Sequence, residues 1–269
     1  QSHFRRNTAA FLLMAASCFG ALALFFHNAP DVQGEACAGV SAASIVVKPL
    51  PKFLGGTGNV VEATKEVWRC AEVYRAAHPT FTLAAFAFVY ITFQAFAVPG
   101  PIVLSILSGA LYSPLMAMLL VALCATFGAS LCFCISYFLG KAIMEKLCPK
   151  MLYSFRDKIR GNRDNLFYYL LFLRITPLLP NWFVNLACPI VEVPFKQFFW
   201  ATFIGLMPAN YFHMSTGRAL SSLKSLSFRD NASTFLLLFC LQFVALLPAM
   251  FKSRLARYEN QKFQSKLRE

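Results

Sequence analysis

Charged side chains are scarce in this chain, and acidic ones are scarcer still. Only 14% of the 269 residues are charged, with 12 Asp and Glu against 25 Lys and Arg, whereas a typical soluble domain carries about 25% charged residues. No Asp or Glu occurs between Phe81 and Lys141. Because 58% of the residues are hydrophobic, the composition excludes an ordinary soluble domain and predicts an all-α polytopic integral membrane protein.

Several kinds of functional site are also missing from the sequence. The glycine cluster at 55–58 lacks the Lys-Ser/Thr pair that completes a phosphate-binding P-loop. His213 has no third group to orient it as a catalytic base, and the nine cysteines indicate neither a disulfide framework nor a zinc cluster. The basic residues come without a nucleic-acid-binding motif. We therefore expect no enzymatic activity, no cofactor, no metal and no nucleic-acid partner.

The apolar runs predict about five membrane-spanning helices, since about 20 residues cross a 30 Å hydrocarbon core. The first is too long for a secretory signal, so we expect it to be retained. The expected spans are 8–26, 81–97, 114–140, 195–214 and 234–251.

These runs divide the chain into five parts. An N-terminal membrane helix (1–27) precedes an extramembrane loop (28–79), a membrane core (80–220), a last membrane helix region (221–251) and a basic tail (252–269). The loop contains one amphipathic helix, from Val60 to His78, with charged residues on one face. We expect it on the membrane surface with Trp68 and Tyr74 at headgroup level, and docking against the protein's own helices remains the alternative.

Two apolar stretches are interrupted at their centres by proline and polar residues. They read FAVPGPIVLSILSGALYSP at 96–114 and FLRITPLLPNWFVNLACP at 172–189. Such a pair points to a transport site built from re-entrant hairpins, because non-helical backbone is tolerated at membrane depth only beside protein or water. We predict hairpins at 98–113 and 166–190. The candidate residues of the first hairpin are Pro99, Gly100, Ser105, Ser108 and Gly109.

Arg174 lies within the second hairpin. An arginine at membrane depth costs about 2.5 to 3.5 kcal/mol even on the most lenient scale, so it needs a partner. The only acid in this region is Glu192. A lipid phosphate, which guanidinium binds bidentately, is one candidate partner. The alternative is that Arg174 reaches an interface or caps carbonyls freed by Pro177.

Polar side chains surround the break in the second hairpin. Pro177 and Pro180 free backbone carbonyls, and Thr176, Asn181 and Asn185 lie beside them. Asn181 and Asn185 share one face if this arm is helical. They either hydrate a passing headgroup or satisfy broken backbone.

Small residues recur every four positions along the helix after the first hairpin. This spacing predicts close helix packing and no chemistry. The residues are Gly128, Cys132, Ser136 and Gly140.

Three strings carry a family resemblance: F-L-R-I-T-P-L-L-P-N-W at 172–182, P-G-P-I-V-L-S-I-L-S-G-A-L-Y at 99–112, and G-A-S followed by Y-F-L-G within 128–140. Over about 81–220 the chain resembles the DedA superfamily. It is most similar to the eukaryotic VTT-domain proteins of the transmembrane protein 41 type.

This resemblance implies two facing re-entrant hairpins in an inverted-repeat-like fold and a multi-pass protein of the endoplasmic reticulum membrane. The implied function is ATP-independent phospholipid scrambling that supports autophagosome formation and lipid distribution. Membrane phospholipids, and proteins of lipid transfer or autophagy, are the implied partners. Arg174 and Pro177 match the family's arginine and proline, and Pro99, Gly100 and Gly109 match its first hairpin.

Two other functions remain open. Bacterial relatives resemble proton-dependent transporters with acids in the first hairpin, and this chain has none there. A proton- or ion-coupled secondary transporter of a small solute, with Arg174 and Glu192 as coupling pair, is the alternative. A scaffold that only recruits partners is a third.

Two arguments from the sequence lead to conflicting orientations of the protein in the membrane. Five alternating spans and the positions of Lys and Arg favour 28–79, 141–165 and the tail as cytoplasmic. The family resemblance instead implies a cytosolic N-terminus.

Overall fold

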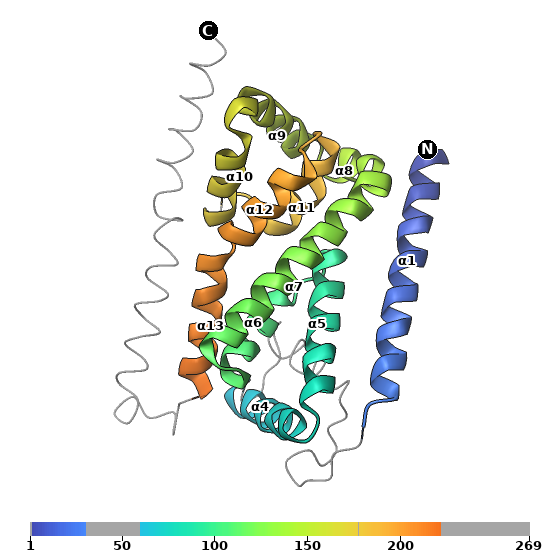
Figure 1. Ribbon diagram of the computed structural model, residues 1–269. Coiled ribbons are helices and arrows are strands. Elements are labelled where there is room, and N and C mark those ends of the chain that lie inside the picture. Colours follow the sequence, from blue (N-terminus) through green and yellow to red (C-terminus); the bar gives the residue numbers. More distant parts are fainter. Residues whose placement is uncertain (1, 31–59, 177, 222–269) are drawn as a thin grey trace.

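The computed structural model describes residues 2–30, 60–176 and 178–221 (Figure 1). Throughout these ranges the chain is all-helical, as predicted, and contains no strand. The helices are α1 (Ser2–His27), α4 (Val60–Ala77), α5 (Pro79–Ala95), α6 (Pro101–Leu111), α7 (Pro114–Ile135), the π-helix η2 (Ser136–Gly140), α8 (Lys141–Leu147), α9 (Pro149–Gly161), the 3₁₀ helix η3 (Arg163–Asn165), α10 (Leu166–Ile175), α11 (Asn181–Ile190), α12 (Phe195–Gly205) and α13 (Met207–Ser221).

Proline begins many of these helices. Pro79, Pro101, Pro114 and Pro149 each occupy the first turn of a helix. At this position the missing N–H would have had no partner within the helix, and the fixed φ of proline suits the helical backbone. The boundaries of α5, α6, α7 and α9 therefore follow directly from the sequence.

Two helices in the described part of the chain are long and apolar enough to cross a membrane: Arg6–His27 and the continuous Pro114–Leu147. The first lies within α1 and is mostly exposed, since only 6% of its most apolar stretch is buried. Phenylalanines of α1 pack against α5 and the turn after it, as in the pair of Phe19 and Phe93 with ring centroids 6.2 Å apart. The second helix runs through α7, η2 and α8, and 56% of its most apolar stretch is buried.

The predicted single span at 195–214 is wrong as a continuous helix. The chain forms α12, breaks at Leu206 and begins again as α13 at Met207. Pro208 explains the break, because proline lacks a backbone N–H and clashes with the preceding turn of a continuing helix. The expected span at 234–251 lies outside the described residues.

Both interrupted segments contain a helix break, but in the first it lies at the start of the segment rather than at its centre, because α6 runs without a break from Pro101 to Leu111 through most of the hairpin predicted at 98–113. The chain turns between α5 and α6, and Ala97 in this turn has a φ of 55°. Gly100 lies directly against Phe93, since a Cβ at this glycine would be 2.6 Å from the Phe93 ring. In the second segment, α10 ends at Ile175 and α11 starts at Asn181.

The described part of the hydrophobic core has two large clusters joined by α7, and a small third one around Cys70 and Tyr74 of α4. One contains α9, α10, α11 and α12, with Phe155, Phe183 and Phe198 almost fully buried. The other contains α5 and α6 with contributions from α1 and α13. Because α7 supplies Phe133 to the first cluster and Val121 to the second, it connects the two halves of the molecule.

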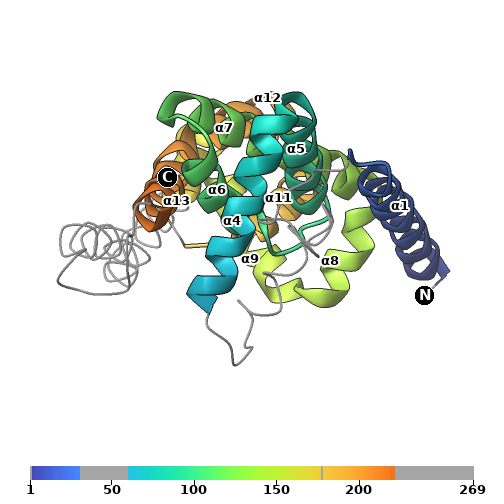
Figure 2. The same ribbon diagram turned by 90° about the horizontal axis from the view of Figure 1, so that it is seen from below.

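The amphipathic helix α4 docks on the protein rather than standing apart from it. It packs against α5 and α6, and Cys70, Ala71 and Tyr74 are buried there. Figure 2 shows α4 crossing one end of the bundle. The docking alternative is therefore the one that the structure supports. Cys70 is also disulfide-bonded, which the sequence analysis did not expect.

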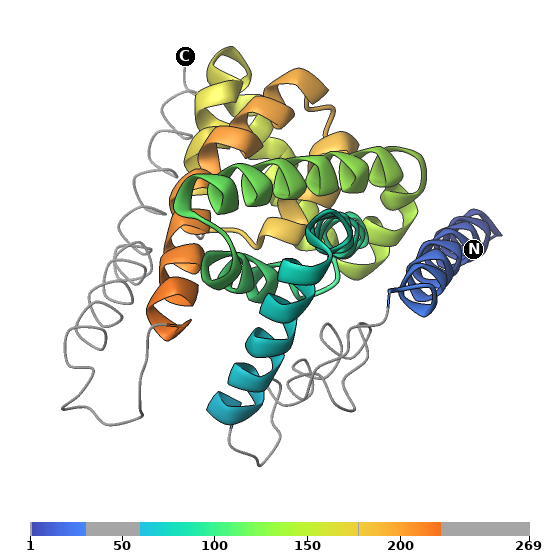
Figure 3. The same cartoon turned by 60° about the horizontal axis from the view of Figure 1, so that its bottom comes forward.

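A different helix lies at each of the two ends of the bundle. Figures 1 and 3 place α4 at one end, where α5 begins, and α8 at the other, where α7 ends. The alternating-span scheme had put 28–79 and 141–165 on the same side. It failed because α6 carries the chain back between α5 and α7, so that these two helices run in the same direction.

Candidate functional site

A cavity of about 830 Å³ lies between the two interrupted segments. One side is formed by α5, the turn at 97–100 and the start of α6, and the other by the end of α10 and the start of α11. The first half of α13 completes the wall. Helix breaks thus line the cavity from two segments, 96–114 and 172–189, that are far apart in the sequence.

Among the described residues that line this cavity, with His213 neutral, Arg174 is the only ionised side chain. It lies in the last turn of α10 and is 7% exposed. Its Nη1 donates to Oδ1 of Asn181, and its Nη2 donates to Oδ1 of Asn185 at 2.7 Å. The two asparagines lie on one face of α11, as predicted, and their side-chain oxygens both accept hydrogen bonds from the guanidinium.

Close packing holds Arg174 in this orientation. Its Cζ lies 5.0 Å from the centroid of the Phe198 ring, a cation–π distance. Gly205 of α12 allows the approach, since a Cβ there would be 2.5 Å from Cβ of Arg174. Arg174 is therefore an integral part of the packing of α10, α11 and α12.

The charge of Arg174 is not neutralised by its partners. Asparagine amides are neutral, and no acidic residue of the described chain lines the cavity. Glu192, the expected acid, pairs instead with Arg163 at 3.3 Å, and both side chains are more than half exposed. Because a buried charge without a counter-charge is costly, the site favours an anionic ligand.

The cavity lining also contains polar groups on α5 and α13 that were not among the predicted site residues. Tyr90 of α5 forms a hydrogen bond of 3.1 Å with Ser105 of α6, and Gln94 follows one turn later on α5. Asn210 and His213 of α13 also line the cavity. The sequence did contain a pattern that could have indicated these residues. Tyr90 and Gln94 are four positions apart, and Asn210 and His213 are three apart, so each pair shares one face of its helix.

The structure places the predicted site residues in three groups. Those that line the cavity are Pro99, Gly100, Ser105, Arg174, Thr176, Pro180, Asn181 and Asn185. Ser108 and Gly109 lie in the packing of α6: Ser108 donates to the Ser105 carbonyl at 2.7 Å, and Gly109 contacts the Met214 carbonyl. Glu192 lies outside the cavity, and Pro177 lies outside the described residues.

The small residues of α7 and η2 make contacts between helices. Gly128 faces α5, where its missing Cβ would be 2.5 Å from Cβ of Gln94. Cys132 is fully buried. Ser136 donates to the Leu186 carbonyl of α11 at 2.6 Å, and Gly140 lies against Ser136 in the π-helix. The stripe thus positions α7 between the two sides of the cavity.

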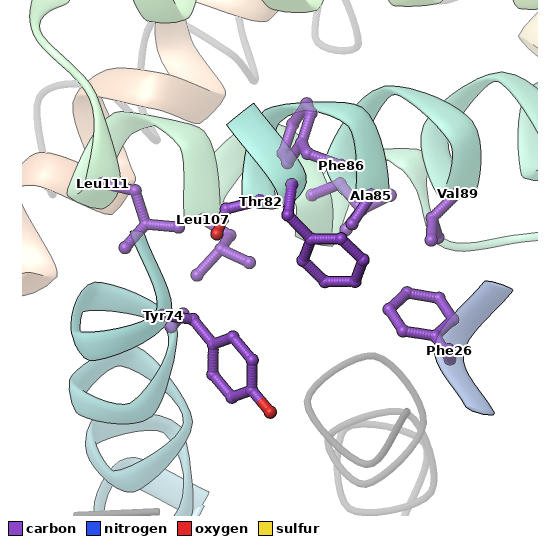
Figure 4. Close-up of a pocket in the computed structure, with 11 residues that line it drawn as sticks. Phe26, Tyr74, Thr82, Ala85, Phe86, Val89, Leu107 and Leu111 are labelled. Atoms are coloured by element: carbon purple, nitrogen blue, oxygen red, sulfur yellow. The ribbon is translucent and has the colours of Figure 1, made fainter. Parts of the chain in front are cut away.

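A second pocket, of about 60 Å³, lies between α1, α4, α5 and α6 (Figure 4). Its lining is apolar apart from Thr82 and Tyr74, and the Thr82 hydroxyl donates to the His78 carbonyl at 2.9 Å. It offers no group for ion recognition. Within the described ranges, no three His, Cys, Asp or Glu side chains gather where they could hold a metal.

Comparison with known proteins identifies the family. The VTT domain model matches residues 98–219, which include both interrupted segments and most of the cavity wall. Transmembrane protein 41B of Xenopus laevis is 36% identical over 195 residues, covering 72% of this chain and 70% of the relative. The Gallus gallus protein of that name is 34% identical over 217 residues, covering 78% and 81%.

A relative from Caenorhabditis elegans has a comparable identity to this chain. The transmembrane protein 41 homolog of Caenorhabditis elegans is 33% identical over 195 residues, covering 72% of this chain and 79% of the relative. No solved structure matches the chain. The predicted resemblance is confirmed, and the chain belongs to the VTT-domain family of membrane proteins that includes transmembrane protein 41B.

Proposed function

We propose that this protein is an ATP-independent phospholipid scramblase of the endoplasmic reticulum membrane. In this proposal it moves lipids between the two leaflets and supports autophagosome formation and lipid distribution. The observation that carries the proposal is the cavity between the interrupted segments, with Arg174 buried in its wall and no acid among the described residues that line it. The two segments act as facing re-entrant hairpins within a bundle of about five spans.

Arg174 retains donors for a lipid phosphate. A guanidinium has five N–H donors, and only Nη1 and Nη2 donate to the two asparagines. A phosphodiester that enters the cavity can accept from the remaining N–H groups in a charge-assisted contact. The headgroup then crosses through a polar cavity while the acyl chains stay in the lipid, which lowers the cost of taking the headgroup through hydrocarbon.

Nothing in this cycle requires an energy source. The lipid exchanges one set of hydrogen-bond partners for another, and movement follows the concentration gradient between leaflets. The neutral partners of Arg174 suit this role, because a fixed carboxylate would compete with the phosphate for the guanidinium.

The secondary transporter has less support. Its proposed coupling pair was Arg174 and Glu192, and Glu192 instead pairs with Arg163 at the surface. The described residues that line the cavity include no carboxylate that could carry a proton between the two sides of the membrane.

Reconstitution into liposomes tests the proposal. Purified protein is incorporated into vesicles with trace fluorescent phospholipid, and dithionite is added outside. We expect bleaching beyond the outer leaflet without ATP, and much less with Arg174→Gln. Arg163→Gln is the matched control, since this arginine is exposed. Bleaching confined to the outer leaflet, together with solute uptake driven by a proton gradient, would support the transporter instead.

A further inference from the structure

The lining of the large cavity has a buried polar part and an exposed apolar part. Several polar residues of the lining are buried, each with at most 7% of its surface exposed: Gln94, Ser105, Arg174 and Asn185. Three large apolar residues of the same lining are exposed instead, Ile102 by 58%, Ile175 by 50% and Trp182 by 41%. We call these three residues the apolar rim. The cavity thus combines a polar interior with apolar surface that the protein itself leaves uncovered.

The apolar rim is continuous with the charged part of the cavity. Ile175 directly follows Arg174 in the last turn of α10, and Trp182 directly follows Asn181 in the first turn of α11. Oδ1 of Asn181 accepts a hydrogen bond from Nη1 of Arg174, which joins the two ends of this helix break at the guanidinium. Ile102, in the first turn of α6, adds apolar surface from the other interrupted segment. The positive charge and the apolar rim therefore belong to one site.

The helix breaks that carry the rim lie at membrane depth. Figure 1 places the end of α5, where the chain turns into α6, and the end of α10 near the middle of the bundle, away from α4 at one end and α8 at the other. Exposed side chains at this depth face the hydrocarbon or the cavity. A site that fills with a water-soluble solute needs a polar entrance at one end of the bundle, whereas an apolar rim at mid-depth suits hydrocarbon chains.

We propose that the cavity is loaded from the side, and that the apolar rim contacts the acyl chains of a phospholipid while its phosphate binds at Arg174. This inference rests on the proposed scramblase function, and it adds the place where the lipid enters. The molecule recognised is an amphiphile with at least one acyl chain, because a free phosphorylated headgroup would leave the rim uncovered. The rim keeps the chains in the hydrocarbon at the point where the headgroup enters the cavity.

A bulky adduct at the rim tests this inference. Ile102→Cys and Ile175→Cys are each purified, labelled with pyrene maleimide in detergent, reconstituted and measured in the dithionite assay. The ratio of the labelled to the unlabelled rate is the readout, so that any effect of the cysteine substitution itself cancels. We expect the adduct to slow lipid movement about 10-fold, the order of rate change that corresponds to forcing an extra group into an occupied space.

Leu119→Cys is the matched control. Leu119 of α7 is 48% exposed and is not among the described residues that line the cavity, so its adduct should leave the ratio at the value of labelled wild type. Wild-type protein is labelled as well, because Cys134 is exposed. A second pair needs no label: Trp182→Ala should slow lipid movement, whereas Trp200→Ala should not, since Trp200 of α12 is 48% exposed outside the lining.

A water-soluble headgroup distinguishes a lipid from a free phosphate compound. Radiolabelled glycerophosphocholine, which has the phosphate and the choline but no acyl chain, is trapped inside the same vesicles. We expect it to stay inside while fluorescent phosphatidylcholine moves between the leaflets. Release of glycerophosphocholine at the rate of lipid movement would show that the cavity takes free headgroups and that loading does not need the rim.

The outcomes separate this inference from the proposed function. If wild-type protein moves no lipid, both are wrong. If wild-type protein moves lipid and the rim adducts slow it no more than the Leu119→Cys adduct does, lateral loading at this rim is wrong and the scramblase function stands. The same conclusion follows if the rim cysteines take up no more label than wild type, because the rim would then be closed, or if Trp182→Ala and Trp200→Ala are equally fast.

Discussion

The contact between α6 and α13 predicts a large effect for a single methyl group. In Gly109→Ala the new Cβ would overlap the Met214 carbonyl, which is backbone and cannot rotate away. Forcing one extra carbon into a packed interface costs about 1 to 3 kcal/mol, and the helix propensity of alanine returns only about 0.5 to 1 kcal/mol. We expect a net loss of about 1 to 2 kcal/mol and a lower Tm in detergent.

The control for this prediction is the same substitution where space is open. No atom lies within 4 Å of a Cβ built at Gly20 in α1, so Gly20→Ala should melt at or slightly above the wild-type temperature. Because α13 carries Asn210 and His213, Gly109→Ala should also slow lipid movement in the dithionite assay. A Gly109→Ala protein that melts like Gly20→Ala would show that α6 and α13 do not meet at this contact.

Three further predictions concern other contacts. Gly128→Leu should lower the Tm, because its Cβ would be 2.5 Å from Cβ of Gln94; an unchanged melting curve would place this face toward lipid. Ser136→Ala should also lower the Tm by removing the donor to the Leu186 carbonyl, whereas Ser17→Ala, which loses an exposed bond within α1, should have little effect. Disulfides persist in oxidising compartments and Cys70 is disulfide-bonded, so we expect α4 on the luminal side of the membrane. A glycosylation sequon fused before Gln1 should then remain unmodified, and a glycan at that sequon would show the opposite orientation.

This orientation removes the conflict seen in the sequence. With α4 luminal, α8 and α9 at the opposite end of the bundle become cytoplasmic, where clusters of Lys and Arg are expected. Since α1 spans between the two ends, the N-terminus becomes cytosolic as well. For α8, α9 and the N-terminus, the positive-inside rule and the family resemblance then agree, whereas the basic residues within 28–79 run against the rule. The chain's own N-x-Ser/Thr glycosylation sequon, Asn231-Ala232-Ser233, lies outside the described residues.

Local features of the chain were readable from the sequence because their causes are local. The scarcity of charge and the abundance of apolar residues follow from the solvent that surrounds a membrane protein. Proline determines where a helix begins or breaks through its own missing N–H, which is why the starts of α5, α6 and α7 and the break before Asn181 were predictable. Pro208 indicates the break between α12 and α13 in the same way, so the prediction of one continuous helix over 195–214 was wrong because hydropathy was given priority over this proline.

The contacts of the candidate site depended on the tertiary structure. Composition showed that Arg174 needs a partner, but it could not choose between Glu192, Asn181 and Asn185, which are all near in sequence. The choice followed from the packing of α10 against α12, which turns Arg174 toward α11 and leaves Glu192 at the surface beside Arg163.

The sequence by itself determined that this is an all-helical membrane protein of a known family with two interrupted segments and a buried arginine. Only the tertiary structure decided which polar groups share one cavity. Tyr90, Asn181 and Asn210 are each separated by tens of residues, and a single polar residue in an apolar helix has no local pattern that reveals its neighbours. Those neighbours are set by where glycines let helices approach, as at Gly109 and Gly205, and close packing of this kind depends on the shapes of both surfaces at once.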